Sequence, residues 1–224
     1  MSTPPKHAKV VIIGGGVSGC SVAYHLAKLG WTDVVLLERK RLTSGTTWHA
    51  AGLIGQLRNN QNMTRMAKYS ADLYHSLEAE TGIATGLRQN GSITVALTEA
   101  RREELLRQAS LARAFGVDVH ELSVTEIKER YPHLNTGDVV AGVFLPKDGQ
   151  CDPANITMAL AKGARMKGAA IFENIKVTDV LKSDARVTGV SWATDDGDAG
   201  TIEADVVVNC AGMWARELGK MSGV

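Results

Sequence analysis

Cysteine is scarce in this chain and shows no motif spacing. The 224 residues include three cysteines, Cys20, Cys151 and Cys210, and no two of them stand in a CxxC arrangement. An odd, scattered set argues against a disulfide framework and for a reducing compartment. The six histidines lack metal-ligand spacing with one another or with the cysteines, so no metal site is predicted. We therefore expect a cytoplasmic protein, or one of the mitochondrial matrix if the source is eukaryotic.

The sequence has neither an excess of one charge nor a long hydrophobic run. Lys and Arg number 25 against 24 for Asp and Glu, which excludes the basic footprint of a nucleic-acid-binding protein. No stretch reaches the roughly 18 apolar residues of a membrane span, and the start MSTPPKHAK is too short and polar for a secretory signal. With 44% hydrophobic residues, the chain is expected to be globular and soluble, with a small-molecule partner.

What the sequence does contain is a β-α-β pattern at its start. An apolar run at 8–13 is followed by the glycine cluster 14–19, a helix-like stretch at 20–30 and a second apolar run at 33–38. Continuous apolar strands are typical of a parallel sheet that is buried on both faces. Gly30 stands where a helix C-cap glycine would stand.

The glycine cluster predicts a dinucleotide site. Gly14, Gly16 and Gly19 fit G-x-G-x-x-G between the first strand and the helix. In this motif the first glycine permits the tight turn, the second lets the backbone approach a pyrophosphate, and the third lets helix and strand pack closely. Glu38, at the end of the second strand, stands where a carboxylate accepts hydrogen bonds from an adenosine ribose, which favours FAD or NAD over NADP. These residues do not distinguish FAD from NAD.

The middle of the chain carries several helix signals. A helix is predicted to end at Gly82, GSITVALT reads as a strand, and Thr98 is expected to cap a following helix. Ser123 and Glu126 form a capping-box pattern for a short helix that Pro132 stops. The residues expected on the buried faces of the two longer helices are Met63, Met66, Ala67, Tyr74 and Leu77 in the first and Leu105, Leu106, Ala109 and Ala112 in the second.

The last third returns to strands. Asp152 and Pro153 read as the N-cap and first residue of a helix that stops at Gly168. Three β-rich segments, at 175–182, 187–194 and 201–204, predict a small meander, and DVVVNCAG at 205–212 then predicts a buried parallel strand.

This order of elements predicts an α/β fold with a doubly wound, Rossmann-like sheet and an inserted α+β element set. The predicted boundaries are a first segment of the dinucleotide-binding domain at 1–84, part of a substrate domain at 85–147, and a second segment of the dinucleotide-binding domain at 148–224.

A family resemblance rests on the stretch TSGTTWHAAGL at 43–53. Small residues surround Trp48 and His49 there, as in a loop whose backbone lies against a ligand. Together with VVIIGGGVSG, the LEAETG, QNGSI and DGQCDP stretches and VVVNCAGMWA, it resembles the sarcosine and dimethylglycine dehydrogenase group. That group belongs to the D-amino-acid oxidase-like FAD superfamily. The resemblance runs over essentially the whole chain, and GTTWHAAGL is its specific element.

The resemblance implies a set of FAD-binding residues. In that family the histidine at the position of His49 is joined covalently to the flavin, and a neutral imidazole nitrogen is a competent nucleophile. Without the resemblance, a loop histidine that is solvated or hydrogen-bonded to backbone is the simpler reading. The implied cofactor-binding residues are Gly14, Gly16, Val17, Ser18, Gly19, Glu38, Arg39, Gly45, Thr46, Thr47, His49, Ala50, Ala51, Gly52, Leu53, Val177, Ala211, Gly212 and Trp214. For Val177 and Trp214, core packing is an alternative role.

The implied function is FAD-dependent oxidative demethylation of a small N-methyl amino acid, sarcosine or dimethylglycine, with water or tetrahydrofolate capturing the product. Catalytic acid–base residues and the electron acceptor stay unassigned. One alternative is another FAD-dependent amino-acid or glycerol-3-phosphate oxidoreductase of the same superfamily. A different class, a non-catalytic FAD-binding module, is also kept.

We also expect the chain to be the N-terminal part of a longer enzyme that does not turn over substrate alone. The resembling enzymes continue well past the position of Val224. Without a continuation, the inserted strands near 91–97 and 139–146 are expected to have unpaired edges.

Overall fold

The computed structural model of the protein describes residues 3–224. The strands are β1 (His7–Ile13), β2 (Val34–Glu38), β3 (Leu53–Ile54), β4 (Ser92–Ala96), β5 (His120–Leu122), β6 (Ala141–Leu145), β7 (Gly149–Gln150), β8 (Ala170–Glu173), β9 (Lys176–Ser183), β10 (Arg186–Ala193) and β11 (Ala199–Asn209). The helices are α1 (Val17–Lys28), α2 (Gln61–Thr81), α3 (Glu99–Ala114), α4 (Val124–Arg130), α5 (Pro153–Met166) and α6 (Ala215–Met221), with short 3-10 turns η1 (Thr47–His49) and η2 (Gly212–Trp214).

The chain forms two compact units. The first comprises Met1–Ala51, Leu77–Thr85 and Asp152–Val224, and the second comprises Gly52–Ser76 and Gly86–Cys151. The sequence-based boundaries at 84/85 and 147/148 stay a prediction.

A six-stranded sheet organises the first unit, in the order β8-β2-β1-β11-β10-β9. β8, β2, β1 and β11 are parallel, whereas β10 and β9 continue from β11 as an antiparallel meander. The apolar runs Val10–Ile13 and Val34–Leu37 are buried along their whole length, as strands covered on both faces must be. The predicted α/β fold with a parallel sheet is thereby confirmed.

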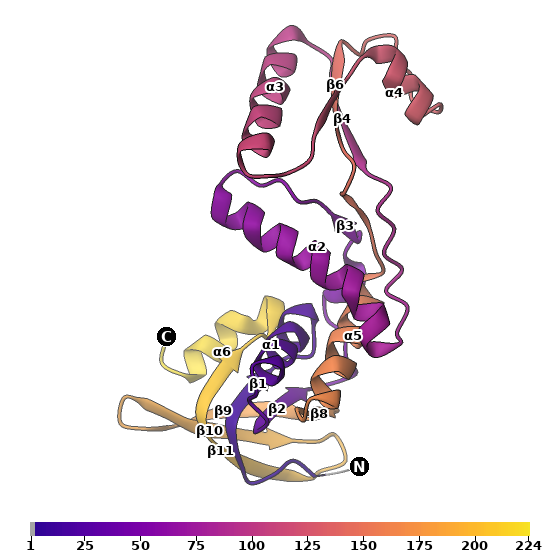
Figure 1. Ribbon diagram of the computed structural model, residues 1–224. Helices are drawn as coiled ribbons and strands as arrows, with labels where there is room; N and C mark the ends of the chain where they lie inside the picture. The colour runs from indigo at the N-terminus through magenta and orange to yellow at the C-terminus, as the bar shows by residue number, and fades with distance from the viewer. Residues whose placement is uncertain (1–2) are drawn as a thin grey trace. The chain divides into compact units, whose positions relative to one another are not determined.

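Different elements pack against the two faces of this sheet. α1 and α5 pack side by side against one face (Figure 1), and Gly163 lets α5 approach Tyr24 of α1 because a Cβ there would lie 2.8 Å from the tyrosine ring. On the other face, Val11, Val35 and Leu37 join Trp192 of the meander in one hydrophobic core. The sheet therefore holds the carboxyl ends of its parallel strands in fixed positions.

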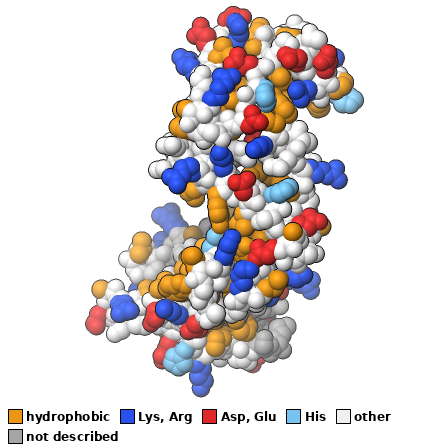
Figure 2. All heavy atoms as spheres, viewed as in Figure 1, with side chains coloured by type: hydrophobic (Ala, Val, Ile, Leu, Met, Phe, Trp, Pro, Cys, Tyr) orange, Lys and Arg blue, Asp and Glu red, His pale blue; other side chains and the backbone are white. Residues whose placement is uncertain are grey.

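The second unit has a three-stranded antiparallel sheet, in the order β4-β6-β5. α3 and α4 lie on either side of it (Figure 1), each with its own hydrophobic core. β3 pairs with β7 in a separate two-stranded ribbon. Figure 2 shows positive and negative side chains interspersed over the face in view, in keeping with the near-neutral net charge of +1.

Most predicted helix ends are confirmed. Thr98 accepts a hydrogen bond from the Arg101 amide at 3.2 Å, and Asp152 accepts one from the Asn155 amide at 2.9 Å. Ser123 begins α4 with the predicted capping box.

Four expectations need correction. The strand near 139–146, expected to have an unpaired edge, is β6, which β4 and β5 pair on both sides. Met63 and Met66 of α2 are 49% and 65% exposed, because the buried stripe of this helix runs through Thr64 and Ala71. Thr64 tolerates burial since its hydroxyl donates to backbone carbonyls.

The third meander segment and the following parallel strand, predicted separately, are one continuous strand, β11, whose first half pairs with β10 and whose second half pairs with β1. The second half was expected to be buried, but Val206 is 45% exposed.

Tyr24, Glu80 and Lys167 connect three helices of the first unit. The Tyr24 hydroxyl donates to Glu80 Oε2 at 2.6 Å, and the Lys167 ammonium pairs with the other carboxylate oxygen. The hydrogen bond from Lys167, followed by that from Tyr24, holds the pKa of the Glu80 carboxyl below its ordinary value of 4.5. The ionised carboxylate therefore links the end of α2 to α1 and α5.

Replacing Glu80 by glutamine is expected to lower the free energy of unfolding by about 1 kcal/mol at pH 7. A carboxyl whose pKa is lowered by folding adds stability above its unfolded pKa and loses it as the pH falls through the folded value. The difference between wild type and Glu80→Gln should therefore shrink as the pH falls below 4.5. Urea unfolding across this range measures it, with the exposed Glu103→Gln as control. A difference that is constant with pH contradicts the prediction.

Candidate functional site

The turn between β1 and α1 depends on two glycines. Gly14 has a φ of +112°, and a Cβ there would overlap the Cys210 carbonyl oxygen. A Cβ on Gly19 would overlap the carbonyl oxygen of Gly14. A side chain at Gly14 would thus push the turn away from the end of β11, and one at Gly19 would push α1 away from the turn, so both close approaches require glycine.

The N-terminus of α1 is supported by a residue from another part of the chain. Gly16 stands at the N-cap position and has no side chain to cap the helix. Thr47, which is 8% exposed, accepts a hydrogen bond from the Val17 amide at 3.0 Å. The remaining amides of the first turn, including those of Ser18 and Gly19, have no acceptor within the helix. They supply the donors and the positive dipole end that an anion would meet.

Replacing Thr47 by valine is expected to lower the free energy of unfolding by about 1 kcal/mol, the typical cost of losing an N-cap. Valine keeps the volume but leaves the Val17 amide without its acceptor. Thermal unfolding of the apo chain measures the change. Thr47→Ser should restore stability, and Thr46→Val, on the exposed neighbour, should leave it unchanged. Equal losses in both threonine-to-valine variants would show that the hydroxyl of Thr47 has no special role.

Glu38 is locked against the same turn. Its Oε2 accepts a hydrogen bond from the Gly15 amide at 2.7 Å, and its Oε1 accepts one from the Lys40 amide at 2.9 Å. Each carboxylate oxygen has a second lone pair. The side chain is thus held in place while it can still accept hydrogen bonds from a ligand.

A cavity of about 190 Å³ lies at these strand ends, and we call it the strand-end cavity. It is lined by the ends of β1 and β2, the loop before η1, the start of β9, η2 and α6. The predicted cofactor-binding residues that line it are Gly14, Gly16, Glu38, Arg39, Gly45, Thr46, Thr47, Val177, Ala211, Gly212 and Trp214.

The other predicted residues lie outside this lining. Val17, Ser18 and Gly19 form the first turn of α1. His49, Ala50 and Ala51 are exposed, and the His49 ring stacks on Trp48 with centroids 3.8 Å apart. Gly52 and Leu53 belong to the second unit, where Leu53 is 77% exposed.

Several lining residues were missed from the sequence: Ile13, Leu37, Ser44, Ile175, Lys176, Cys210, Glu217, Leu218 and Met221. Five of these, Ile13, Leu37, Ser44, Lys176 and Cys210, directly precede a predicted residue and could have been found by adjacency. The residues of α6 could not, because nothing local indicates that this helix returns to the cavity.

Burial favours the protonated form of the two thiols in the first unit, Cys20 and Cys210. Burial raises the pKa of Cys20 to about 12, and burial also raises the pKa of Cys210. Thiolate chemistry in the cavity is therefore unfavourable. Within residues 3–224, no group of three or more His, Cys, Asp or Glu side chains is placed to hold a metal ion.

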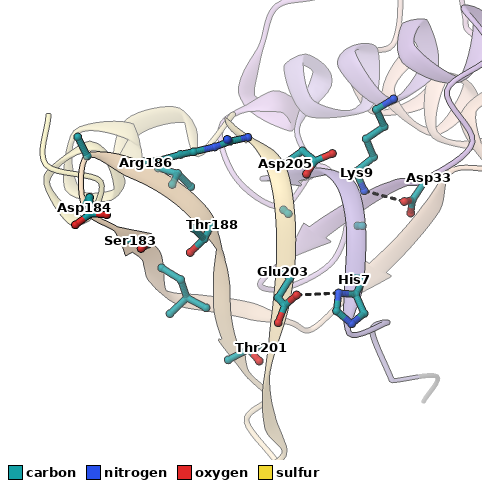
Figure 3. A pocket seen from close by; sticks show the side chains of 15 residues that line it. His7, Lys9, Asp33, Ser183, Asp184, Arg186, Thr188, Thr201, Glu203 and Asp205 are labelled. Carbon is teal, nitrogen blue, oxygen red and sulfur yellow. Dashed lines mark hydrogen bonds and ion pairs between the residues drawn. The ribbon is translucent and has the colours of Figure 1, made fainter.

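A larger, open concavity of about 1150 Å³ lies at the other end of the sheet. Figure 3 shows its charged side chains of both signs, and His7 Nδ1 lies 3.0 Å from the Glu203 carboxylate. The backbone amide of Lys9 also donates to the Asp33 carboxylate at 2.9 Å. None of the predicted cofactor-binding residues lines this concavity, so it is not the candidate site.

No helix of the described residues is both long and apolar enough to cross a membrane.

The chain is similar to several proteins over nearly its whole length. Sarcosine dehydrogenase, mitochondrial, of Homo sapiens is 44% identical over 226 residues, covering 98% of this chain and 24% of the relative. Dimethylglycine dehydrogenase, mitochondrial, of Homo sapiens is 43% identical over 97% of this chain and 24% of the relative. The pyruvate dehydrogenase phosphatase regulatory subunit, mitochondrial, of Mus musculus is 43% identical over 96% and 24%. The chain thus spans about a quarter of the length of these relatives.

Among solved structures, L-proline dehydrogenase from P. horikoshii superposes with a TM-score of 0.90 at 29% identity, covering 99% of this chain and 57% of that one. The predicted resemblance to sarcosine and dimethylglycine dehydrogenases is confirmed. A model of the family described as "DAO: FAD dependent oxidoreductase" matches residues 9–224, and the chain belongs to that family.

Proposed function

We propose that the strand-end cavity binds the adenosine diphosphate half of FAD. The observation that carries this is the convergence of Gly14, the α1 N-cap residue Gly16 and Glu38 on one cavity. Free amides at a helix N-terminus suit a diphosphate, and a carboxylate at the end of the second strand suits ribose hydroxyls. The 190 Å³ of the cavity is below the roughly 300–1,000 Å³ of pockets that enclose a whole ligand. It therefore fits part of the dinucleotide.

The second part of the proposal is a covalent bond between His49 and the flavin. His49 is exposed on a loop of small residues, so its imidazole is accessible to a ring system laid against the loop. The stack on Trp48 limits the orientations of the imidazole. A neutral imidazole nitrogen has the nucleophilicity that such a bond needs.

For the whole protein we infer oxidative demethylation of a small N-methyl amino acid, sarcosine or dimethylglycine. The names of the relatives support this substrate class. Bound FAD supplies the two-electron oxidation of the N-methyl carbon. The residues of this chain hold the diphosphate and the ribose and present the loop around His49. Tetrahydrofolate remains a predicted acceptor of the one-carbon unit. A mitochondrial matrix location is proposed for a eukaryotic source, since those relatives are mitochondrial.

A second candidate function is a non-catalytic, FAD-binding regulatory role. It is favoured by the 43% identity to a protein named as a phosphatase regulatory subunit. That similarity is nearly as strong as the similarity to the dehydrogenases, so the cofactor domain alone does not separate the two.

An absorbance spectrum of the purified protein before and after acid precipitation tests cofactor and linkage together. Flavin absorbance that stays with the precipitate supports FAD and the bond to His49, whereas flavin released by acid contradicts the bond. Release of NAD, or no flavin at all, overturns the cofactor. Bleaching of the flavin on anaerobic addition of sarcosine or dimethylglycine supports the dehydrogenase, and bleaching only by other donors supports another oxidoreductase. These bleaching tests use the whole protein, and no bleaching of it by any donor supports the regulatory role.

A further inference from the structure

Arg39 and Trp214 meet across the glycine turn. The guanidinium carbon of Arg39 lies 3.7 Å from the centroid of the Trp214 ring, well within the roughly 6 Å range of a cation–π contact. Arg39 directly follows β2 and Trp214 follows β11, and these strands are the two neighbours of β1. The pair therefore spans the end of β1, where the Gly14 turn begins, and both residues line the strand-end cavity.

Trp214 is the fixed partner of this pair. The side chain of Asn209 accepts a hydrogen bond from the Ala211 amide at 3.2 Å and donates to the Ala215 carbonyl at 2.8 Å, which closes the turn on both sides of Trp214. The Trp214 amide donates to the Ala211 carbonyl at 3.1 Å. The half-buried indole lies 3.9 Å from the position that a Cβ on Gly45 would take. The hydrogen bonds thus fix the backbone of the turn that carries the indole, and one edge of the ring lies near Gly45.

Arg39 is the exposed partner, and its guanidinium donates no hydrogen bond within residues 3–224. The side chain is exposed and forms no ion pair with any carboxylate among residues 3–224. The neighbouring Glu38 already accepts from two backbone amides. Stacking occupies the face of a guanidinium, whereas its N–H groups lie in the plane and stay available. Without the indole, this long side chain would sample many rotamers.

We propose that Trp214 is a positioning residue: its indole holds the Arg39 guanidinium over the glycine turn, where the cation binds the diphosphate of an adenine dinucleotide. This inference rests on the proposed FAD site. Arginine suits phosphate oxygens because its planar N–H groups donate in pairs. The N-terminus of α1 and Arg39 then contact the diphosphate from two sides. Because the stack already orders the Arg39 side chain, ligand binding loses less conformational entropy.

A double-mutant cycle on the 224-residue chain tests this, with ADP as the probe and calorimetric titration as the measurement. Arg39→Gln is expected to weaken ADP binding about tenfold, the usual cost of a charge-assisted hydrogen bond. Trp214→Leu is expected to weaken it about fivefold through the lost stack. In the Arg39→Gln background, Trp214→Leu should have no further effect. Trp214→Phe, which keeps an aromatic face, should recover most of the affinity.

Two readouts separate positioning from a general structural role. Both Arg39→Gln and Trp214→Leu should reduce the salt dependence of ADP binding, because each removes a cation from the phosphate. Both should leave the affinity for adenosine, which has no phosphate, unchanged. The exposed Arg186, in the concavity at the other end of the sheet, provides the matched control, and Arg186→Gln should change nothing.

Additive effects of the two substitutions overturn the proposal, as does an equal loss of adenosine and ADP affinity. If Trp214→Leu unfolds the chain, the ADP affinities of the conservative variants Trp214→Phe and Arg39→Lys test the proposal instead. Arg39→Lys keeps the charge without the planar group and should lose affinity, whereas an unchanged affinity would show that the stack has no role. A wild-type chain that binds neither FAD nor ADP would instead overturn the proposed function itself.

Discussion

Replacing Gly19 by alanine is expected to abolish FAD binding and to destabilise the chain. The new Cβ would overlap the carbonyl oxygen of Gly14 and would lie 3.4 Å from the Cys210 side chain. Overpacking costs about 1–3 kcal/mol and occasionally more, and here the obstructing atom belongs to the backbone and cannot rotate away. We expect a loss of about 3 kcal/mol in the free energy of unfolding. Moving α1 also displaces its amides from the diphosphate, so FAD affinity should fall at least about 100-fold.

Thermal unfolding of the apo chain and FAD titration by flavin fluorescence measure the two effects. Gly219→Ala is the matched control, because Gly219 lies in α6 and a Cβ there would meet its nearest atom at an ordinary 3.7 Å. The control should keep both stability and FAD affinity. Wild-type behaviour of Gly19→Ala would contradict the close approach of α1 to the Gly14 turn.

Replacing His49 by alanine is expected to remove all acid-stable flavin while FAD remains bound. The imidazole is exposed on a surface loop and packs mainly on Trp48, so its loss should cost little stability. The strand-end cavity does not include His49 and should keep its affinity for the adenosine diphosphate half. Flavin fluorescence of the acid-denatured protein should disappear, and the same amount of FAD should appear in the supernatant.

The exposed His133→Ala variant serves as control and should retain acid-stable flavin. Acid-stable flavin in His49→Ala would place the covalent bond on another residue. A wild-type protein whose denatured band carries no flavin would show that the cofactor is held without a covalent bond.

Signals that act over a few residues allowed much of the fold to be predicted. The buried runs that became β1 and β2, the glycine turn and the caps at Thr98, Ser123 and Asp152 each depend on neighbouring residues. Continuous hydrophobicity, positive φ and side-chain capping are local properties, so the pattern predicts them directly. The family-specific stretch around His49 then indicated the cofactor class, which the family match supports.

Strand pairing was harder to predict, because it depends on partners far along the chain. β8 follows α5 as a short apolar segment and was not predicted, although its pairing with β2 completes the parallel sheet. β11 combines two predicted segments because one strand can serve the meander at one end and β1 at the other. In α2, periodicity alone predicted that Met63 and Met66 are buried. Thr64 is buried instead, because its hydroxyl forms hydrogen bonds with backbone carbonyls.

The sequence by itself therefore determined the β-α-β unit, the glycine turn, the acid at the second strand end and the class of cofactor. Only the tertiary structure decided what converges on them: Thr47 as the cap of α1, the stack of Arg39 on Trp214 and the residues of α6 at the cavity. Such contacts join residues that are 30 or more positions apart, as with Val17 and Thr47. No local propensity encodes them, because they arise when the sheet brings the carboxyl ends of β1, β2 and β11 to one edge.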